Sequence, residues 1–164
     1  MSRYTIVANN MELLCRNMPR PEIICCITQY GTYTAQANHT QIKIYPLFFA
    51  HGVSNKNMLF VFAHELGHVY YYNLEYVDKK RIMYNSENEI PHFGQGFFTN
   101  AQGTEEGFAD LFAMFLTNPK ELKLKYPEQY SVLVSLIGMN DRDRLLRYLK
   151  SIDFKQLKEK LMLY

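Results

Sequence analysis

The feature that most constrains this chain is the motif H-E-x-x-H at residues 64–68. Apolar stretches precede and follow the motif, and this pattern favours a buried or cleft-lining helix. On a helix, residues four apart lie on one face, so the imidazoles of His64 and His68 can bind one metal ion. Glu65 lies about 100° further round the helix axis, where its carboxylate can reach a metal-bound water. The motif therefore predicts a metal site with a carboxylate beside it.

A catalytic zinc ion usually takes three protein ligands and keeps one position open for water, so a third ligand is needed. A second apolar helix carries Glu106 and Asp110 one turn apart on one face. We expect Glu106 to be the third ligand and Asp110 to accept the remaining ring N–H of His64 or His68. Glu105 fits better as a solvated residue of the first turn, where the helix dipole favours negative charge.

Other choices for the third ligand are weaker. The metzincin pattern needs Gly and His at positions occupied by Tyr71 and Leu74, which excludes that class. His92 stands in a polar stretch, but no recognised spacing links it to the motif.

The two helical motifs together resemble those of the gluzincin metallopeptidases, in which a helical glutamate is the third zinc ligand. Residues 106–119 and 127–130 look like the catalytic domain of anthrax lethal factor and the Pro-Pro endopeptidases. The same glutamate helix, with a strand ahead of the motif helix, is also similar to the ImmA/IrrE-type regulatory peptidases. The order of elements matches from about residue 32 to residue 130.

The resemblance implies a zinc-dependent endopeptidase that binds one Zn²⁺ and acts on a peptide or protein substrate. Glu65 would activate the zinc-bound water and carry its proton to the leaving amine. In the ImmA/IrrE branch the substrate would be a cytoplasmic repressor.

The chain departs from the lethal factor pattern at the tyrosine that helps to stabilise the oxyanion. In those enzymes this tyrosine lies a little upstream of the glutamate ligand, but residues 95–104 contain none. Tyr84 and His92 are the candidate replacements for oxyanion or substrate binding. Without such a donor the rate would fall by a factor on the order of 10²–10³. A non-catalytic, zinc-stabilised regulatory or binding module is therefore the alternative function.

The expected fold is an α+β, zincin-like single domain spanning residues 1–164, with a small mixed sheet, an edge strand and C-terminal helices. The expected elements are a helix at 11–18, strands at 22–28, 32–37 and 41–45, the motif helix at 55–78, an irregular excursion at 83–104, the glutamate helix at 104–116 and helices at 119–125, 128–137, 142–150 and 154–163. The edge strand at 32–37 would bind an extended peptide.

Composition and charge narrow the possible binding partners and the cellular compartment. The net charge of +2 offers no basis for binding nucleic acid or an anionic membrane. No apolar run is long enough to span a bilayer. Three cysteines, two of them adjacent, make a poor disulfide framework and indicate small buried side chains in a reduced compartment. No signal peptide is visible, so we expect a cytoplasmic protein, or a secreted one if a leader precedes this sequence. The oligomeric state is left open.

Overall fold

A computed structural model describes residues 3–7, 13–16, 18–50, 52–80, 82 and 103–162. Within these ranges the chain is a mixed α+β structure in which helices predominate, as the sequence predicts. The elements are β1 (Arg3–Val7), β2 (Leu13–Cys15), β3 (Met18–Pro19), β4 (Glu22–Cys26), β5 (Ala35–Ala37), β6 (Gln41–Ile44), the 3₁₀ helix η1 (Pro46–Phe49), α1 (Asn55–Tyr72), α3 (Gly103–Thr117), α4 (Pro119–Lys125), α5 (Pro127–Ile137), α6 (Met139–Ser151) and α7 (Phe154–Met162).

The main sheet has four strands in the order β1-β4-β6-β5. β4 and β6 are parallel, whereas β1 pairs with β4 and β5 pairs with β6 in antiparallel register. β6 alternates buried Ile42 and Ile44 with half-buried neighbours, as a strand with one covered face does. β5 lies at the edge of the sheet, where a further strand can pair with it.

The turn between β5 and β6 is built by the side chain of Asn38. Its Oδ1 accepts hydrogen bonds from the backbone N–H groups of Thr40, at 2.9 Å, and of Gln41, at 2.8 Å. An asparagine that bonds its own chain two or three residues on stabilises a tight reversal. The hairpin predicted from the sequence is therefore confirmed, with a first arm that begins at Ala35.

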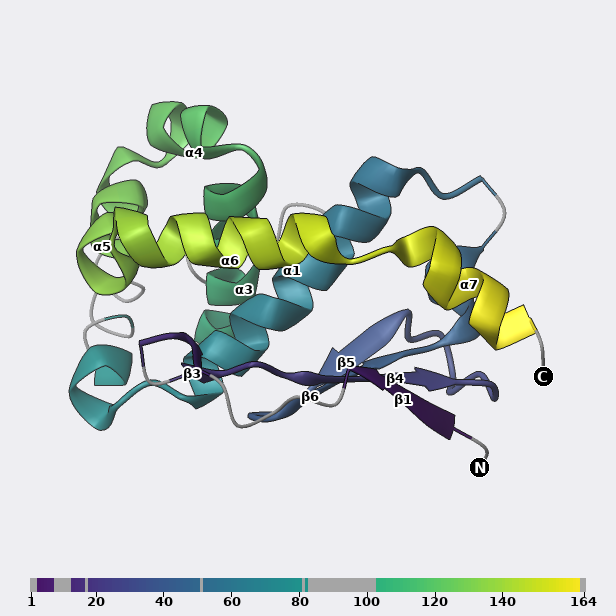
Figure 1. Ribbon diagram of the computed structural model, residues 1–164. Helices are drawn as coiled ribbons and strands as arrows, with labels where there is room; N and C mark the ends of the chain where they lie inside the picture. Colours follow the sequence, from purple (N-terminus) through teal and green to yellow (C-terminus); the bar gives the residue numbers. More distant parts are fainter. Residues whose placement is uncertain are drawn as a thin grey trace.

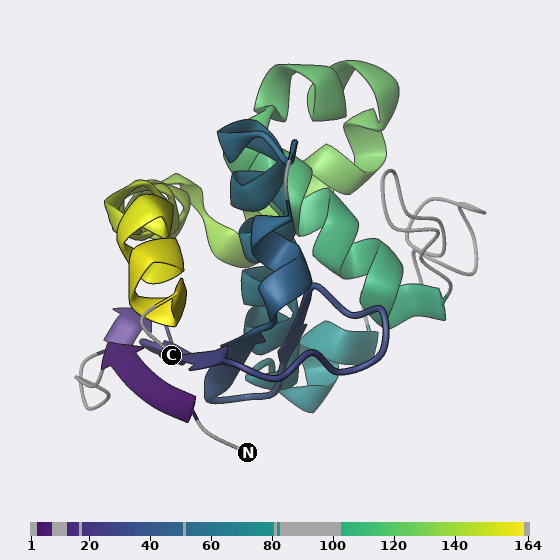
Figure 2. The same cartoon turned by 90° about the vertical axis from the view of Figure 1, so that its right-hand side faces the viewer.

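The helices lie over one face of the main sheet (Figures 1 and 2). α1 crosses above β5 and β6, and α7 covers β4. α3 packs beside α1, and α6 runs across the molecule to contact both helices and the small β2–β3 sheet. The core between these layers is aromatic and aliphatic, and its largest fully buried side chains are Phe62, Phe108, Phe112, Phe115, Met18, Ile23, Ile24, Ile42, Ile44, Leu66 and Ile82.

The three cysteines are free and buried, as expected for small core side chains. Burial raises the pKa of the Cys15 and Cys25 thiols to about 12, which keeps both in the unreactive protonated form. No helix in the described part of the chain is both long and apolar enough to cross a bilayer.

Two predicted helices are wrong in type or extent. Residues 13–15 and 18–19 form a small antiparallel sheet in place of a helix at 11–18, and its buried side chains Leu14, Cys15 and Met18 belong to the core. The motif helix ends at Tyr72 rather than near Asp78, and residues 76–80 form a separate helical segment. Asn73 ends α1, because its side-chain amide donates to the carbonyl of Val69 at 2.8 Å and to that of His39 at 2.8 Å.

Candidate metal centre

The H-E-x-x-H motif lies in the second half of α1, which is an uninterrupted helix of 18 residues. Ser54 begins it: its hydroxyl oxygen accepts a hydrogen bond from the backbone N–H of Asn57 at 3.2 Å, as an N-cap does. This confirms the predicted cap. All residues from Phe62 to Tyr70 are buried, so the helix presents both histidines and Glu65 within the molecule rather than on an outer face.

Close packing of α1 against α3 brings the two motifs together. A Cβ atom added to Gly67 would lie 3.0 Å from Cα of Ala109 and 3.1 Å from the side chain of Phe112. A Cβ atom at these distances would be tighter than most real contacts, so a larger residue at this position would push α1 and α3 apart by a few tenths of an ångström. Ala109 and Ala113 are fully buried on the facing side, in agreement with the prediction that small residues let the helices approach.

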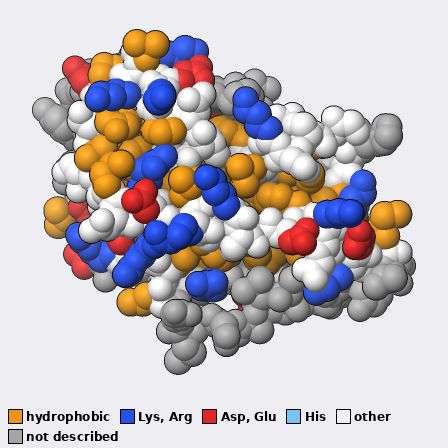
Figure 3. Space-filling model, turned by 45° about the horizontal axis from the view of Figure 1, so that its top comes forward, with side chains coloured by type: hydrophobic (Ala, Val, Ile, Leu, Met, Phe, Trp, Pro, Cys, Tyr) orange, Lys and Arg blue, Asp and Glu red, His pale blue; other side chains and the backbone are white. Residues whose placement is uncertain are grey.

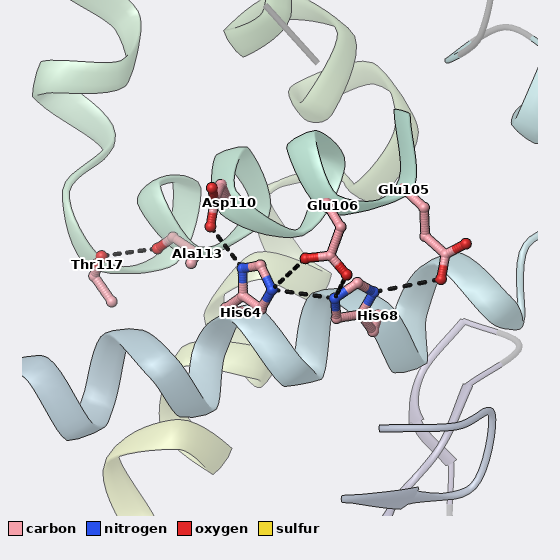
Figure 4. Close-up of polar contacts among 7 residues, drawn as sticks. All are labelled: His64, His68, Glu105, Glu106, Asp110, Ala113 and Thr117. Atoms are coloured by element: carbon pink, nitrogen blue, oxygen red, sulfur yellow. Dashed lines mark hydrogen bonds and ion pairs between the residues drawn. The ribbon is translucent and has the colours of Figure 1, made fainter. Parts of the chain in front are cut away.

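The side chains of His64, His68 and Glu106 meet between the two helices (Figure 4). The two Nε2 atoms lie 3.1 Å apart. One carboxylate oxygen of Glu106 lies 3.2 Å from Nε2 of His64, and the other lies 3.0 Å from Nε2 of His68. Their ligand atoms all lie within 4.8 Å of one another, so this group can hold a metal ion. It is the set of three predicted from the sequence.

Asp110 fixes the ring of His64. Its Oδ1 lies 2.6 Å from Nδ1 of His64, and the carboxylate is completely buried on α3. Nδ1 therefore donates to the carboxylate, which turns Nε2 toward Glu106. The sequence left open which histidine Asp110 would contact, and the structure selects His64.

The metal-free group holds positive charge on His64. Burial lowers the pKa of His64, but hydrogen bonds to Asp110 and Glu106 outweigh burial and raise it to about 10. Hydrogen bonds from His64 and His68 to Glu106 hold the pKa of its carboxyl group well below its ordinary value. The carboxylates of Asp110 and Glu106 thus stabilise positive charge between the two helices. A metal ion bound there would be stabilised in the same way.

His68 has a different environment. Its Nδ1 is buried and has no hydrogen-bond partner among the described residues, and Oε1 of Glu105 lies 3.6 Å away. Tyr72 stacks on the His68 ring at 6.1 Å between centroids with an interplanar angle of 20°. Burial and a hydrogen bond to Glu105 raise the pKa of the Tyr72 hydroxyl. Glu105 lies in the first turn of α3 with its side chain 40 % exposed, as predicted, and it also faces His68 and Tyr72.

Glu65 lies beside the cluster with only 8 % of its surface exposed. Burial raises its pKa, while the neighbouring histidines oppose that rise. A carboxylate whose pKa is raised by burial binds a proton more readily than an exposed one, which suits a group that accepts a proton during catalysis.

A cleft of about 530 Å³ opens in front of these residues. One wall is α1, which contributes His64, Glu65, His68 and Tyr72, and α3 adds Glu106. The opposite wall is the segment 32–38, which includes the whole of the edge strand β5. The cleft therefore lies between the metal-binding group and a strand edge that is paired on one side.

The other predicted site residues, Tyr84 and His92, lie outside the described residues. The sequence did not predict that Tyr72 would stack on His68 and line the cleft. It also did not predict that Gly67 would lie at the close contact between α1 and α3. Tyr72 lies two turns after His64 on the same helix, and this spacing of eight residues was the available signal. Comparisons with protein-family models, curated proteins and solved structures found no match to the chain.

Proposed function

We propose that the protein is a zinc-dependent endopeptidase of the gluzincin type. The observation that carries this proposal is the convergence of His64, His68 and Glu106 within 4.8 Å at the floor of an open cleft, with Glu65 buried beside them. A structural zinc site would be closed by a fourth protein ligand, whereas the described residues supply three ligands beside a cleft, a set that would leave a position for water.

The donor set and its spacing support zinc as the metal. Two imidazoles and one carboxylate are ligands that zinc prefers. With zinc–nitrogen bonds of about 2.0–2.1 Å, the ligand atoms of a tetrahedron are separated by about 3.3 Å. The two Nε2 atoms, at 3.1 Å, are close to this separation, and each of them lies 3.0–3.2 Å from a different oxygen of Glu106.

In this proposal, Glu65 and Asp110 have separate roles in peptide hydrolysis. A zinc ion held by His64, His68 and Glu106 would supply Lewis-acid polarisation of the scissile carbonyl and would lower the pKa of a bound water. Glu65 accepts the proton of that water and delivers it to the leaving amine, a role favoured by its raised pKa. Asp110 accepts the Nδ1–H of His64 and so directs Nε2 toward Glu106 and His68, where it could bind the metal.

The edge of β5 supports an extended peptide as the substrate. β5 pairs with β6 on one side, and its residues line the cleft opposite the metal-binding group. A peptide added as a further strand would make backbone hydrogen bonds to β5 and cross the site with its scissile bond near Glu65. The hydroxyl of Tyr72, in the same cleft, is our candidate donor to the substrate carbonyl.

The decisive experiment measures zinc content and digests a peptide library with wild type, Glu65→Gln and Glu159→Gln. Glu159 is an exposed residue of α7 and provides the matched control. We expect one zinc ion per chain in all three proteins, and cleavage that is lost only in Glu65→Gln. Zinc without cleavage in wild type would favour the regulatory or binding module, and absence of zinc would contradict the metal site itself.

A further inference from the structure

A second cavity lies away from the candidate metal centre, between β2, the segment after β3, and α6. It measures about 480 Å³ and is lined by Leu13, Leu14, Arg20, Arg144, Arg147, Tyr148 and Ser151. None of these residues lines the cleft beside His64, so the cavity is a separate feature of the molecule.

The charged residues that line this cavity are all arginines. Three of the seven arginines in the chain meet here, although lysines are more numerous in the sequence. A guanidinium presents a planar fork of N–H donors that matches two oxygens of a phosphate, which an ammonium group does not. Basic side chains are spread over the face in Figure 3, so positive charge alone does not mark the site.

Two donors in the cavity wall lack acceptors. The guanidinium of Arg20 lies over the ring of Tyr148 at 5.3 Å from its centroid. Nε of Arg20 and the hydroxyl of Tyr148 are buried and have no hydrogen-bond partner among the described residues. Tyr148 is only 5 % exposed. Leaving such groups without partners costs stability, and a bound oxyanion would offer them acceptors.

The nearest acidic side chains of α6 are occupied elsewhere. Asp141 accepts a hydrogen bond from the backbone N–H of Arg16 at 3.2 Å, and Asp143 faces Arg142 at 3.6 Å. Neither of them lines the cavity. Among the described residues, therefore, no carboxylate in the cavity wall neutralises the positive charge of the three arginines.

We propose that this cavity is a binding site for a phosphate group, held by the guanidinium groups of Arg20, Arg144 and Arg147 and by the hydroxyl of Tyr148. Its volume exceeds that of a single phosphate ion, and the apolar side chains of Leu13 and Leu14 line the remainder. These features fit a phosphate monoester with a small organic body better than the free ion. The proposal is independent of the metallopeptidase assignment.

The test is calorimetric titration of the full chain with inorganic phosphate and with glycerol 3-phosphate, at an ionic strength that screens exposed charges. Arg147→Gln should weaken binding about tenfold or more, since it removes a charged hydrogen-bond donor. Tyr148→Phe should weaken it about fivefold while leaving the melting temperature of the phosphate-free protein unchanged or higher, because it removes a hydroxyl without a partner. Lys150→Gln, which removes the same charge from α6 outside the cavity, is the control.

Binding of both ligands, or of either one, with losses confined to Arg147→Gln and Tyr148→Phe would support the site. Tighter binding of glycerol 3-phosphate would identify a monoester as the ligand, and binding of inorganic phosphate alone would identify the free ion. The proposal is overturned if neither ligand binds at millimolar concentration, or if Lys150→Gln weakens binding as much as Arg147→Gln does. It is also overturned if binding is unchanged in Tyr148→Phe while that variant melts as wild type does.

Discussion

The two histidines of the candidate metal centre lie one helical turn apart but in contrasting surroundings. His64 contacts Asp110, whose carboxylate is completely buried, across 2.6 Å. His68 faces Glu105, whose side chain is 40 % exposed, across 3.6 Å (Figure 4). Tyr72 stacks on the ring of His68. One half of the site is therefore closed and held by core packing, and the other half opens toward solvent and the cleft.

This difference indicates a division of roles. A buried carboxylate in direct contact orients its histidine strongly, because little water competes for the hydrogen bond. A half-exposed carboxylate at a longer distance constrains its partner weakly, and Tyr72, whose hydroxyl is hydrogen-bonded to Glu105, lines the open cleft. We therefore expect the His64 half to set metal affinity and the His68 half to meet the substrate.

The largest expected effect lies on the open half. Tyr72→Phe removes the hydroxyl proposed to donate to the substrate carbonyl, and we expect kcat to fall by a factor on the order of 100 with zinc content unchanged. Steady-state kinetics with a peptide substrate measures this. Tyr76→Phe, at an exposed position in the next helical segment, is the control. A loss of zinc in place of a loss of kcat would show that Tyr72 supports the metal instead.

A substitution at Asp110, in the closed half of the site, should change the affinity for zinc. Asp110→Asn removes the carboxylate that orients His64, and we expect zinc affinity to fall about 10- to 100-fold. Competition against a chromogenic chelator measures the dissociation constant, and circular dichroism checks that the variant is folded. An unchanged affinity would mean that the buried contact has no part in holding the metal.

The closed half also predicts how the metal-free protein responds to pH. The pKa of His64 is raised to about 10 in the folded state, so its contribution to stability is complete below about pH 6.5 and is lost as the pH rises toward 10. Between pH 7 and pH 9 we expect the melting temperature of the metal-free protein to fall by about 3 °C or more. Thermal unfolding in the presence of a chelator tests this, and Asp110→Asn should flatten the slope. A melting temperature that rises over this range would contradict the prediction.

The smallest effect belongs to Glu105. Glu105→Gln keeps the hydrogen-bonding shape but removes a half-exposed charge, and we expect zinc affinity to change by no more than about threefold. The same chelator competition measures it alongside Asp110→Asn. If both substitutions weakened zinc equally, the contrast between the two halves would be wrong.

Local patterns predicted most of the helical architecture. Ser54 caps α1, Pro119 begins α4, and Gly138, with a positive φ of 81°, separates α5 from α6. The sequence patterns also separated β4 from the β5–β6 hairpin. They failed at residues 13–19, because the apolar positions there suit a helix or a short hairpin equally, and contacts with α6 select the hairpin.

The candidate site shows the same difference between features that lie within one element and contacts that join two elements. The sequence by itself determined that His64 and His68 share one face and that Glu106 and Asp110 share another, because the helical repeat sets positions within an element. Tertiary structure alone decided that Asp110 meets His64, that Glu105 turns toward His68, and that Tyr72 and β5 enclose the cleft. Those contacts join different elements, and their distances depend on how closely α1 packs on α3 at Gly67. The helical repeat orders residues along one helix, but side-chain packing sets the distance to the next.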